Sequence, residues 1–593
     1  MAFCQHSSEA EQLFCKQWVG GSNPSAGSNM FYSLANSGFS GILPLNAEVA
    51  EWTIAADCKS VAIRLRRFES YPRHTFTRAS RPFSMEESLS HRTLKNALWQ
   101  VFNLGWLTIL NFFATPILLK RFGLENYGVY VLILTMFTFL SLLDFGMGAG
   151  FSYGFIEYTV KKDDAARARL VSTFLAFWAC VGVAGLLFFT VSSFFTGSLF
   201  GVKDEFVRQA QIGFLFAGGY FLLAMISSLF LAMASAIQRF DIIGKAIFVQ
   251  NTALNALLVL VALMRPSLSW VMASHFFAAA LAAAVYVVLL KRELPWLQMR
   301  IRFHPSEFFR KFGFSAFNSV CAFANSSLLQ VDRFFVSRML GNTQLSLYAV
   351  PNNLAQKIYS ISASGAMTLF PVSSALSHGK ERERMKRGFR RAMKFSLLFS
   401  VIAGTVMLAF GKQLLLFWVG KDIATIGTGL LYYFVPIYVL MSVYTVVSSF
   451  YLGTGDSRIM ATFSAGMALV NVALLAILVP RFGITGAAAA YLAAVLPVLG
   501  FWAMFEIRVL KDAYFVRAYT GLFLKLALVC LPFWFFARTI LAALAVNLVA
   551  VLTCIAGSFT GIIVLYWFFG FFDSEDKELI RAFTFSVIKG KRN

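Results

Sequence analysis

The sequence predicts an all-α, polytopic membrane protein that crosses the bilayer about fourteen times. Hydrophobic residues make up 58% of the 593 residues and charged residues only 14%, whereas a soluble protein carries about 25% charged residues. The apolar residues are gathered into long runs. Each run greatly exceeds the roughly 9–11 residues of a membrane-spanning β-strand, so the run lengths favour long helices over a barrel.

From residue 96 onward, the apolar runs are long enough for a helix to cross a hydrocarbon core of about 30 Å. The break between the fifth and sixth runs rests on Arg265 and Pro266 alone. The predicted spans are 96–119, 126–156, 170–202, 209–238, 246–264, 266–290, 312–337, 339–373, 395–411, 423–455, 459–480, 482–505, 518–537 and 539–572.

Basic residues between the spans indicate the orientation of the chain. If the segment before the first span is cytoplasmic, that side holds about 26 Lys and Arg residues and the other side about 10. The difference comes mainly from 291–311 and 378–394. Both termini are therefore predicted to be cytoplasmic. The net charge of +23 reflects this topology and an attraction to anionic lipid headgroups, rather than nucleic-acid binding.

The seven cysteines form neither a CxxC pair nor a metal-ligand spacing. Four of them fall within apolar spans, where cysteine behaves as a small hydrophobic residue. We therefore expect no disulfide framework, no metal site and no cofactor.

Residues 1–84 differ from the rest of the chain. They contain no apolar run of span length and no hydrophobic region of a signal peptide. Met85 begins a short polar and then basic lead into the first span. We expect 1–84 to be either a disordered extension or the product of an upstream start that is not the natural one.

Two spans carry polar stripes that cannot face lipid at low cost. In the seventh run, Asn318, Asn325 and Asp332 recur every seven residues, which places them on one helix face. In the eighth run, Asn353 and Lys357 share a face. A central Lys costs about 2.5–3.5 kcal/mol on membrane-insertion scales, so such residues usually face a bundle interior or a wet cavity. This pattern predicts the lining of a pathway.

Depth along the helix distinguishes the charged residues of these two runs. Asp332 and Arg333 lie about 30 Å along the seventh run. That depth is near the outer mouth, where an interfacial salt bridge or snorkelling is the ordinary explanation. Lys357 lies about 21 Å into the eighth run, well inside the hydrocarbon region. The nearest acidic residues in the sequence are Asp332 and Glu381.

Other spans carry isolated polar residues that allow two interpretations. Gln100 and Asn111 lie in the first run, where they either line the same interior or hydrogen-bond to neighbouring helices. Asp144 in the second run is either a gate or an interfacial residue. For His275 in the sixth run we expect a packed, hydrogen-bonded ring rather than a proton relay.

A weak internal repeat divides the chain into two halves. Gly123 precedes Tyr130 by seven residues, and Gly341 precedes Tyr348 by seven. Such repeats are typical of transporters in which two bundles pack around a central site. The predicted parts are an extension (1–84), an amino-terminal lobe (85–290), a cytoplasmic linker (291–311), a carboxyl-terminal lobe (312–508), two further helices (509–572) and a cytoplasmic tail (573–593).

Three sequence pieces carry a family resemblance: LLDFGMGAG, LLQVDRFFVSRMLGNTQLSLYAVPNNL and VPRFGITGAAAAYLAAV. They resemble the polysaccharide (O-antigen-type) flippases of the multidrug, oligosaccharidyl-lipid and polysaccharide exporter superfamily. The resemblance covers residues 86–572. It implies two six-helix lobes that face each other in a V, with helices 13 and 14 appended. It also implies a bacterial inner-membrane protein that translocates an undecaprenyl-diphosphate-linked oligosaccharide to the outer leaflet for surface polysaccharide biosynthesis.

The resemblance also assigns roles to the polar residues of the spans. The implied partners are the lipid-linked oligosaccharide, the lipid bilayer and other polysaccharide-assembly proteins, with no nucleic acid. Arg and Lys hold phosphate well, so Arg333 and Lys357 become candidates for the diphosphate. Candidates for ion coupling or gating are Asp332 and Asp144. The other cavity candidates are Asn353, Asn325, Asn318, Asn111 and Gln100.

Two other function classes compete with this interpretation. A cation-coupled multidrug exporter of the same superfamily typically uses a carboxylate in its first helix, and the first run here contains none. A membrane glycan polymerase or ligase would need a sizeable external loop, and the HExxH, Gly-x-Ser-x-Gly and phosphate-loop motifs do not occur. We therefore expect a transporter that works by alternating access, and not an enzyme.

Overall fold

The computed structural model describes residues 85–577 except 201, 203, 295–299, 367–381, 455–456, 513–514 and 575. Side chains are described throughout these ranges except at 85–101, 104, 198–199, 311–322, 364–366, 382, 457, 515 and 518. The chain divides into two units, Met1–Met85 and Glu86–Asn593. The predictions for 1–84 and for most of the 573–593 tail lie outside the described residues.

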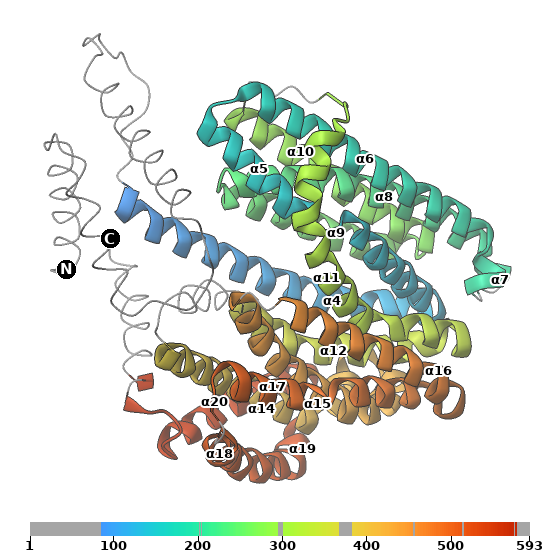
Figure 1. The fold of residues 1–593 in the computed structure, drawn as a ribbon. Coiled ribbons are helices and arrows are strands. Elements are labelled where there is room, and N and C mark those ends of the chain that lie inside the picture. The colour runs from blue at the N-terminus through green and yellow to red at the C-terminus, as the bar shows by residue number, and fades with distance from the viewer. Residues whose placement is uncertain are drawn as a thin grey trace, which may run out of the picture. The chain divides into compact units, whose positions relative to one another are not determined.

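The described residues of the second unit form helices and connecting turns, as predicted (Figure 1). In chain order, the elements are α4 (Met85–Ser141), η1 (Leu142–Asp144), α5 (Met147–Lys161), α6 (Asp164–Phe194), α7 (Thr196–Phe200), α8 (Asp204–Ala236), α9 (Phe240–Met264), α10 (Leu268–Glu293), α11 (Pro305–Leu340), α12 (Asn342–Ala366), α14 (Arg382–Val419), α15 (Lys421–Gly453), α16 (Ser457–Val495), α17 (Val498–Met504), η2 (Phe505–Val509), α18 (Phe515–Phe536), η3 (Ala537–Leu541), α19 (Ala542–Leu544) and α20 (Leu548–Phe568).

Ten helical stretches of the described chain are long and apolar enough to cross a membrane, judged by length and composition. Two of them, Gly105–Lys161 and Arg458–Val509, contain 57 and 52 residues, and each is long enough for two crossings. The polar-striped helices α11 and α12 are not among the ten. Adding them, and counting the two long stretches twice, gives about fourteen crossings, in agreement with the number of predicted spans.

Four glycines bend the chain between successive spans. Gly123, Gly341, Gly420 and Gly483 have φ angles of 78°, 91°, 103° and 60°, each with an extended ψ. This backbone region is open essentially to glycine alone. Because spans alternate in direction, all four bends fall at the same end of the helices, which we call the glycine end. The predicted break at Arg265 and Pro266 is also confirmed, since α9 ends at Met264 and α10 begins at Leu268.

The opposite end, which we call the basic end, holds most of the basic residues of the connections. The stretch 378–394 was predicted to be a connection, but α14 already begins at Arg382. Lys386 and Arg390 of this helical extension both pair with Asp512. Lys394 lies 2.6 Å from Asp576, which is 2% exposed. The extension is therefore docked on the ends of helices that follow it by more than a hundred residues in sequence.

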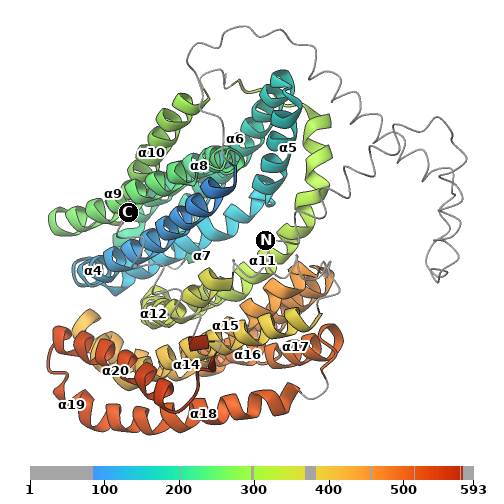
Figure 2. The ribbon, with the colours of Figure 1, turned by 90° about the vertical axis from the view of Figure 1, so that its left-hand side faces the viewer.

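The helices pack in two groups that match the order of the sequence. In the first group α8 packs on α6 and α10, and α9 packs on α10. In the second group α15 packs on α12 and α14, while α11 packs on α16. We call these groups the amino-terminal lobe (α4–α10) and the carboxyl-terminal lobe (α11–α17). In Figure 2 the two groups lie on opposite sides of the described unit, and α18 lies at its outer edge.

Helix α11 belongs to both lobes. At its start, the Phe308 ring lies 5.1 Å from Phe177 and 6.3 Å from Phe174, both in α6 of the amino-terminal lobe. The Tyr158 hydroxyl of α5 donates to Glu307 at 2.8 Å. Farther along, α11 packs chiefly on α16. The helix therefore crosses from the amino-terminal lobe at the basic end to the carboxyl-terminal lobe at the glycine end.

Candidate functional site

Asp332 of α11 is fully buried inside the carboxyl-terminal lobe. Its exposed fraction is 0%, as is that of Tyr348 in α12. The Tyr348 hydroxyl donates to Asp332 Oδ2 at 2.5 Å, and the Arg333 backbone N–H donates to Oδ1 at 2.9 Å. The sequence-based explanation of an interfacial salt bridge or snorkelling at this position is therefore wrong. Helix packing, which depth along one helix does not reveal, encloses the carboxyl group.

Arg333 points to the neighbouring helix instead of to water. Its Nη2 donates to Asn353 Oδ1 of α12 at 2.7 Å, and the residue is only 7% exposed. Among the described residues, its Nε has no hydrogen-bond partner. A buried guanidinium with an unused donor is costly unless an anion or water completes its hydrogen bonds. Arg333 is therefore the clearest candidate for an anion contact within the described chain.

Lys357 follows Asn353 by one helical turn. Residues four apart lie on the same helix face, about 6 Å from each other. Lys357 is half-buried, and the described residues supply neither a hydrogen bond nor an ion pair to its ammonium group. We call Arg333, Asn353 and Lys357 the cationic cluster. The structure joins Arg333 to Asn353 by a hydrogen bond, and Lys357 lies one turn from Asn353 on the same helix.

Asn325 has a different environment from the cationic cluster. Its Oδ1 accepts from the Tyr444 hydroxyl of α15 at 3.1 Å, and Tyr444 also contacts Ser464 Oγ at 2.6 Å. On α12, Asn352 Oδ1 accepts from Tyr438 at 2.5 Å. These amides therefore connect helices within the carboxyl-terminal lobe. The side chains of Asn318 and Gln100 lie outside the described residues.

Within the described residues, no hydrogen bond joins Asn111 or Asp144 of the amino-terminal lobe to the cationic cluster. Asn111 is half-buried, and its backbone oxygen accepts from Thr115 at 2.7 Å. Its neighbour Phe112 and Leu354 of α12 both pack against an apolar cluster formed by Leu414, Ala545 and Val551. Asp144 ends the short element η1 and accepts a hydrogen bond from Trp178 Nε1 of α6.

Buried tyrosines are the site residues that sequence reasoning missed. Tyr348 was noted for its spacing from Gly341, but its bond to Asp332 was not predicted. The equivalent Tyr130 bonds His275 Nε2 at 3.1 Å, in agreement with the predicted packed histidine. In both halves, a glycine bend is therefore followed seven residues later by a buried tyrosine that bonds an ionisable side chain. The repeat was the signal that could have found this role.

The two lobes touch closely at the glycine end. Asn342 of α12 is 3% exposed, and its Nδ2 donates to the Phe200 carbonyl of the amino-terminal lobe at 3.0 Å. Ser337 Oγ donates to Asn342 Oδ1 at 2.8 Å. The Ser346 hydroxyl donates to the Leu124 carbonyl across the same boundary. We call this set the interlobe contact.

The chain matches two family models. One, described as "Polysaccharide biosynthesis protein", matches residues 93–377, and the MatE model matches residues 319–477. A "Putative O-antigen transporter" of Shigella flexneri is 21% identical over 67% of this chain and 93% of its own length. One of Salmonella typhi is 22% identical over 52% of this chain and 69% of its own length.

Solved structures show the same fold. The "Lipid II flippase MurJ, inward closed conformation" has a TM-score of 0.62 at 14% identity, covering 79% of this chain and 98% of its own. An inward-facing multidrug resistance MATE family transporter of the MOP superfamily has a TM-score of 0.57 at 15% identity, covering 69% and 96%. At these identities the likeness concerns the fold alone.

The helical spans, the buried polar cluster and these matches define a multi-pass membrane transporter rather than an enzyme. More narrowly, residues 93–377 match the polysaccharide biosynthesis family model, and the curated relatives of the chain are described as putative O-antigen transporters.

Proposed function

We propose that this protein translocates an undecaprenyl-diphosphate-linked oligosaccharide from the cytoplasmic to the outer leaflet of the bacterial inner membrane. The cationic cluster carries this proposal. Arg333 is buried with an unused Nε donor, and Lys357 lies one turn beyond its partner Asn353. A diphosphate would offer an anionic group to each of the two cations, and Arg and Lys are the residues that bind phosphate best.

The membrane position of the cluster supports the same substrate class. An unpaired cation inside a lipid-length helix is costly unless a wet cavity or an anionic ligand accommodates it. A diphosphate passing between the lobes would satisfy both cations, while the polyprenyl tail stays in lipid. Organic cations, the cargo of multidrug exporters, would be repelled by the same cluster. The description of two relatives as putative O-antigen transporters supports a glycan-bearing cargo.

For the mechanism we propose alternating access, in which the lobes rock around this site. The interlobe contact closes the glycine end, so the described conformation corresponds to a state in which that end is shut. Orientation follows from the basic residues, which put the basic end and both termini in the cytoplasm. Asp332 and Asp144 remain candidates for ion coupling, and other polysaccharide-assembly proteins remain proposed partners.

Deletion of the gene in its own host tests the proposal. We expect loss of surface polysaccharide and accumulation of the lipid-linked intermediate on the cytoplasmic leaflet, both restored by the wild-type chain. The intermediate is located by its accessibility to a glycosidase added to intact spheroplasts. Normal polysaccharide display together with raised sensitivity to cationic dyes would contradict the proposal and favour a multidrug exporter.

A further inference from the structure

A second candidate site lies away from the cationic cluster, between α14 and α18. Helix α18 packs on α14, α20 and η3 at the edge of the unit (Figure 2). Between α14 and α18 lies an apolar cleft of about 420 Å³. Residues that line it include Val401, Thr405, Leu408, Phe523, Cys530 and Trp534.

The cleft has a buried floor and an exposed rim. Leu526 and Cys530 form the floor at 2% and 4% exposure, whereas Phe523 and Leu531 at the rim are 42% and 64% exposed. The cleft is therefore open along one side, and in a bilayer that side faces lipid. An extended hydrocarbon chain can enter it sideways, without passing between the lobes.

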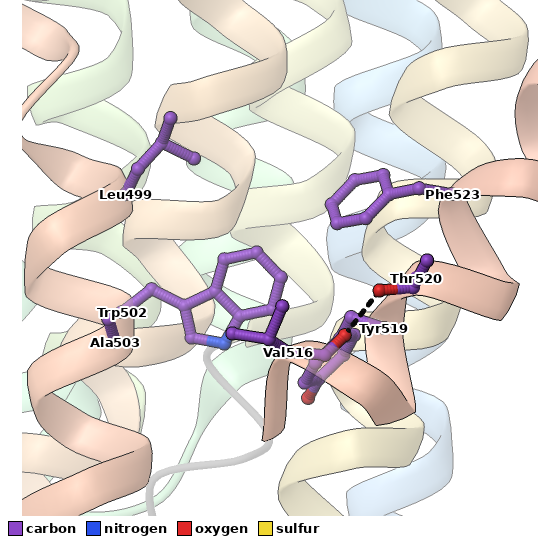
Figure 3. Close-up of a pocket in the computed structure, with 7 residues that line it drawn as sticks. All are labelled: Leu499, Trp502, Ala503, Val516, Tyr519, Thr520 and Phe523. Atoms are coloured by element: carbon purple, nitrogen blue, oxygen red, sulfur yellow. Dashed lines mark hydrogen bonds between the residues drawn. The ribbon is translucent and has the colours of Figure 1, made fainter. Parts of the chain in front are cut away.

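The length of the cleft matches one leaflet. From Phe523 to Trp534, α18 rises about 17 Å, and half of a hydrocarbon core of about 30 Å is about 15 Å. A smaller cleft of about 220 Å³ shares Phe523 with the first, and Figure 3 shows the residues that line it. Trp502 and Tyr519 line that second cleft. The first cleft is long enough for the acyl chain of one leaflet, whereas a polyprenyl chain would extend beyond it.

A cation stands at the glycine-end limit of the cleft. Arg538 in η3 lies one turn beyond Trp534, and its guanidinium is 5.3 Å from the Trp534 ring centroid and 6.0 Å from that of Tyr432. It also donates to the Tyr432 hydroxyl. The two rings hold the guanidinium in place while the residue stays exposed. A guanidinium has five donors, so several remain for a phosphate.

We propose that this cleft is a binding site, which we call the seat, for one phospholipid. Its acyl chain lies between α14 and α18, and its phosphate contacts Arg538. The apolar lining and the length of the cleft favour an acyl chain of one leaflet, and the guanidinium of Arg538 favours a phosphate group. The ligand is a component of the membrane rather than the cargo, so the seat is independent of the proposed function. The bound lipid supplies packing for α18, whose apolar face is otherwise covered only in part.

The test uses native mass spectrometry on the full-length protein in detergent, with phosphatidylglycerol as the ligand. Diacylglycerol with the same chains lacks the phosphate, and undecaprenyl phosphate has a longer chain. We expect one tightly held phosphatidylglycerol and at least tenfold weaker binding of diacylglycerol. Arg538→Gln should weaken phosphatidylglycerol binding about tenfold, and Ala527→Phe, which fills the cleft, should abolish it.

Matched controls are Arg481→Gln at another exposed arginine of the glycine end and Ala556→Phe on the exposed face of α20. Both should bind phosphatidylglycerol as the parent does. Equal binding by Arg538→Gln and the parent would overturn the seat, as would equal binding of diacylglycerol or binding of undecaprenyl phosphate alone. If Ala527→Phe aggregates, the exposed Arg538→Gln substitution decides the outcome alone.

Discussion

Gly128 of α4 lies against the backbone of Asn342 in α12, so closely that a Cβ at position 128 would stand 1.9 Å from the Asn342 carbonyl oxygen. The neighbouring atoms belong to the backbone and cannot rotate away. The two lobes therefore meet at a point where only glycine fits. The interlobe contact through Asn342 and Ser346 depends on this approach.

Gly128→Ala should prevent the lobes from closing at the glycine end. We expect it to reduce transport at least tenfold while the protein still accumulates in the membrane. Ser346, which is 0% exposed in the described state, is the position to monitor. A cysteine placed there should react faster with a membrane-impermeant maleimide in the Gly128→Ala background, with the native cysteines of the parent as the baseline.

The control for this substitution is Gly105→Ala in the same helix. A Cβ at Gly105 meets nothing within 4 Å, so transport and labelling should match those of the parent. Unchanged labelling in Gly128→Ala would show that the contact opens and closes without this glycine.

Lys357→Ala should insert and accumulate normally yet lose most flipping, because it removes a cation of the proposed diphosphate site. Lys357→Arg keeps the charge and should retain part of the activity. Depth along the helix places Arg333 near the outer mouth, which by itself predicts a milder effect for Arg333→Ala. Because Arg333 is buried and donates to Asn353, we expect a comparable loss of transport instead. Transport is measured as surface polysaccharide restored to a deletion strain. Wild-type export by Lys357→Ala would contradict the assignment of Lys357 to the diphosphate site.

Tyr348→Phe should destabilise the carboxyl-terminal lobe. It deletes the hydroxyl that donates to the buried Asp332 carboxyl group, and leaving such a group short of a donor costs about 1–3 kcal/mol. Thermal unfolding in detergent measures the loss. Tyr433→Phe, a half-buried tyrosine of α15, is the control and should unfold like the parent. Equal unfolding of Tyr348→Phe and the control would mean that the carboxyl group finds another donor.

The proposed orientation predicts the outcome of reporter fusions. A cytoplasmic reporter joined after Leu294, between α10 and α11, should be active, and a periplasmic reporter joined after Gly420, between α14 and α15, should be active. The reason is the excess of basic residues on the side of Leu294. The opposite pair of activities would reverse the proposed direction of transport.

The spans and their breaks could be predicted from sequence because run length and glycine bends are local signals. Gly341 can bend the chain whatever packs around it, so its position in the sequence was enough to predict the break between the two spans. The environment of Asp332 was not predictable in the same way. Its burial depends on Tyr348 in the next helix and on the packing of α15. The spacing of residues within α11 carries no information about those contacts. The ion pair between Lys394 and Asp576 could not be predicted either, because 182 residues separate the two side chains in the sequence.

The crossing of α11 between the lobes has a consequence for how the protein can be assembled. Phe308 and Glu307 in the first turn of α11, and the backbone N–H of His304 just before it, which donates to Thr173 Oγ1 at 3.3 Å, all contact the amino-terminal lobe. A chain cut between α10 and α11 would therefore keep this attachment without a covalent bond. Two separately expressed fragments, one ending before the linker and one beginning ahead of Pro305, should recombine in the membrane into a working transporter.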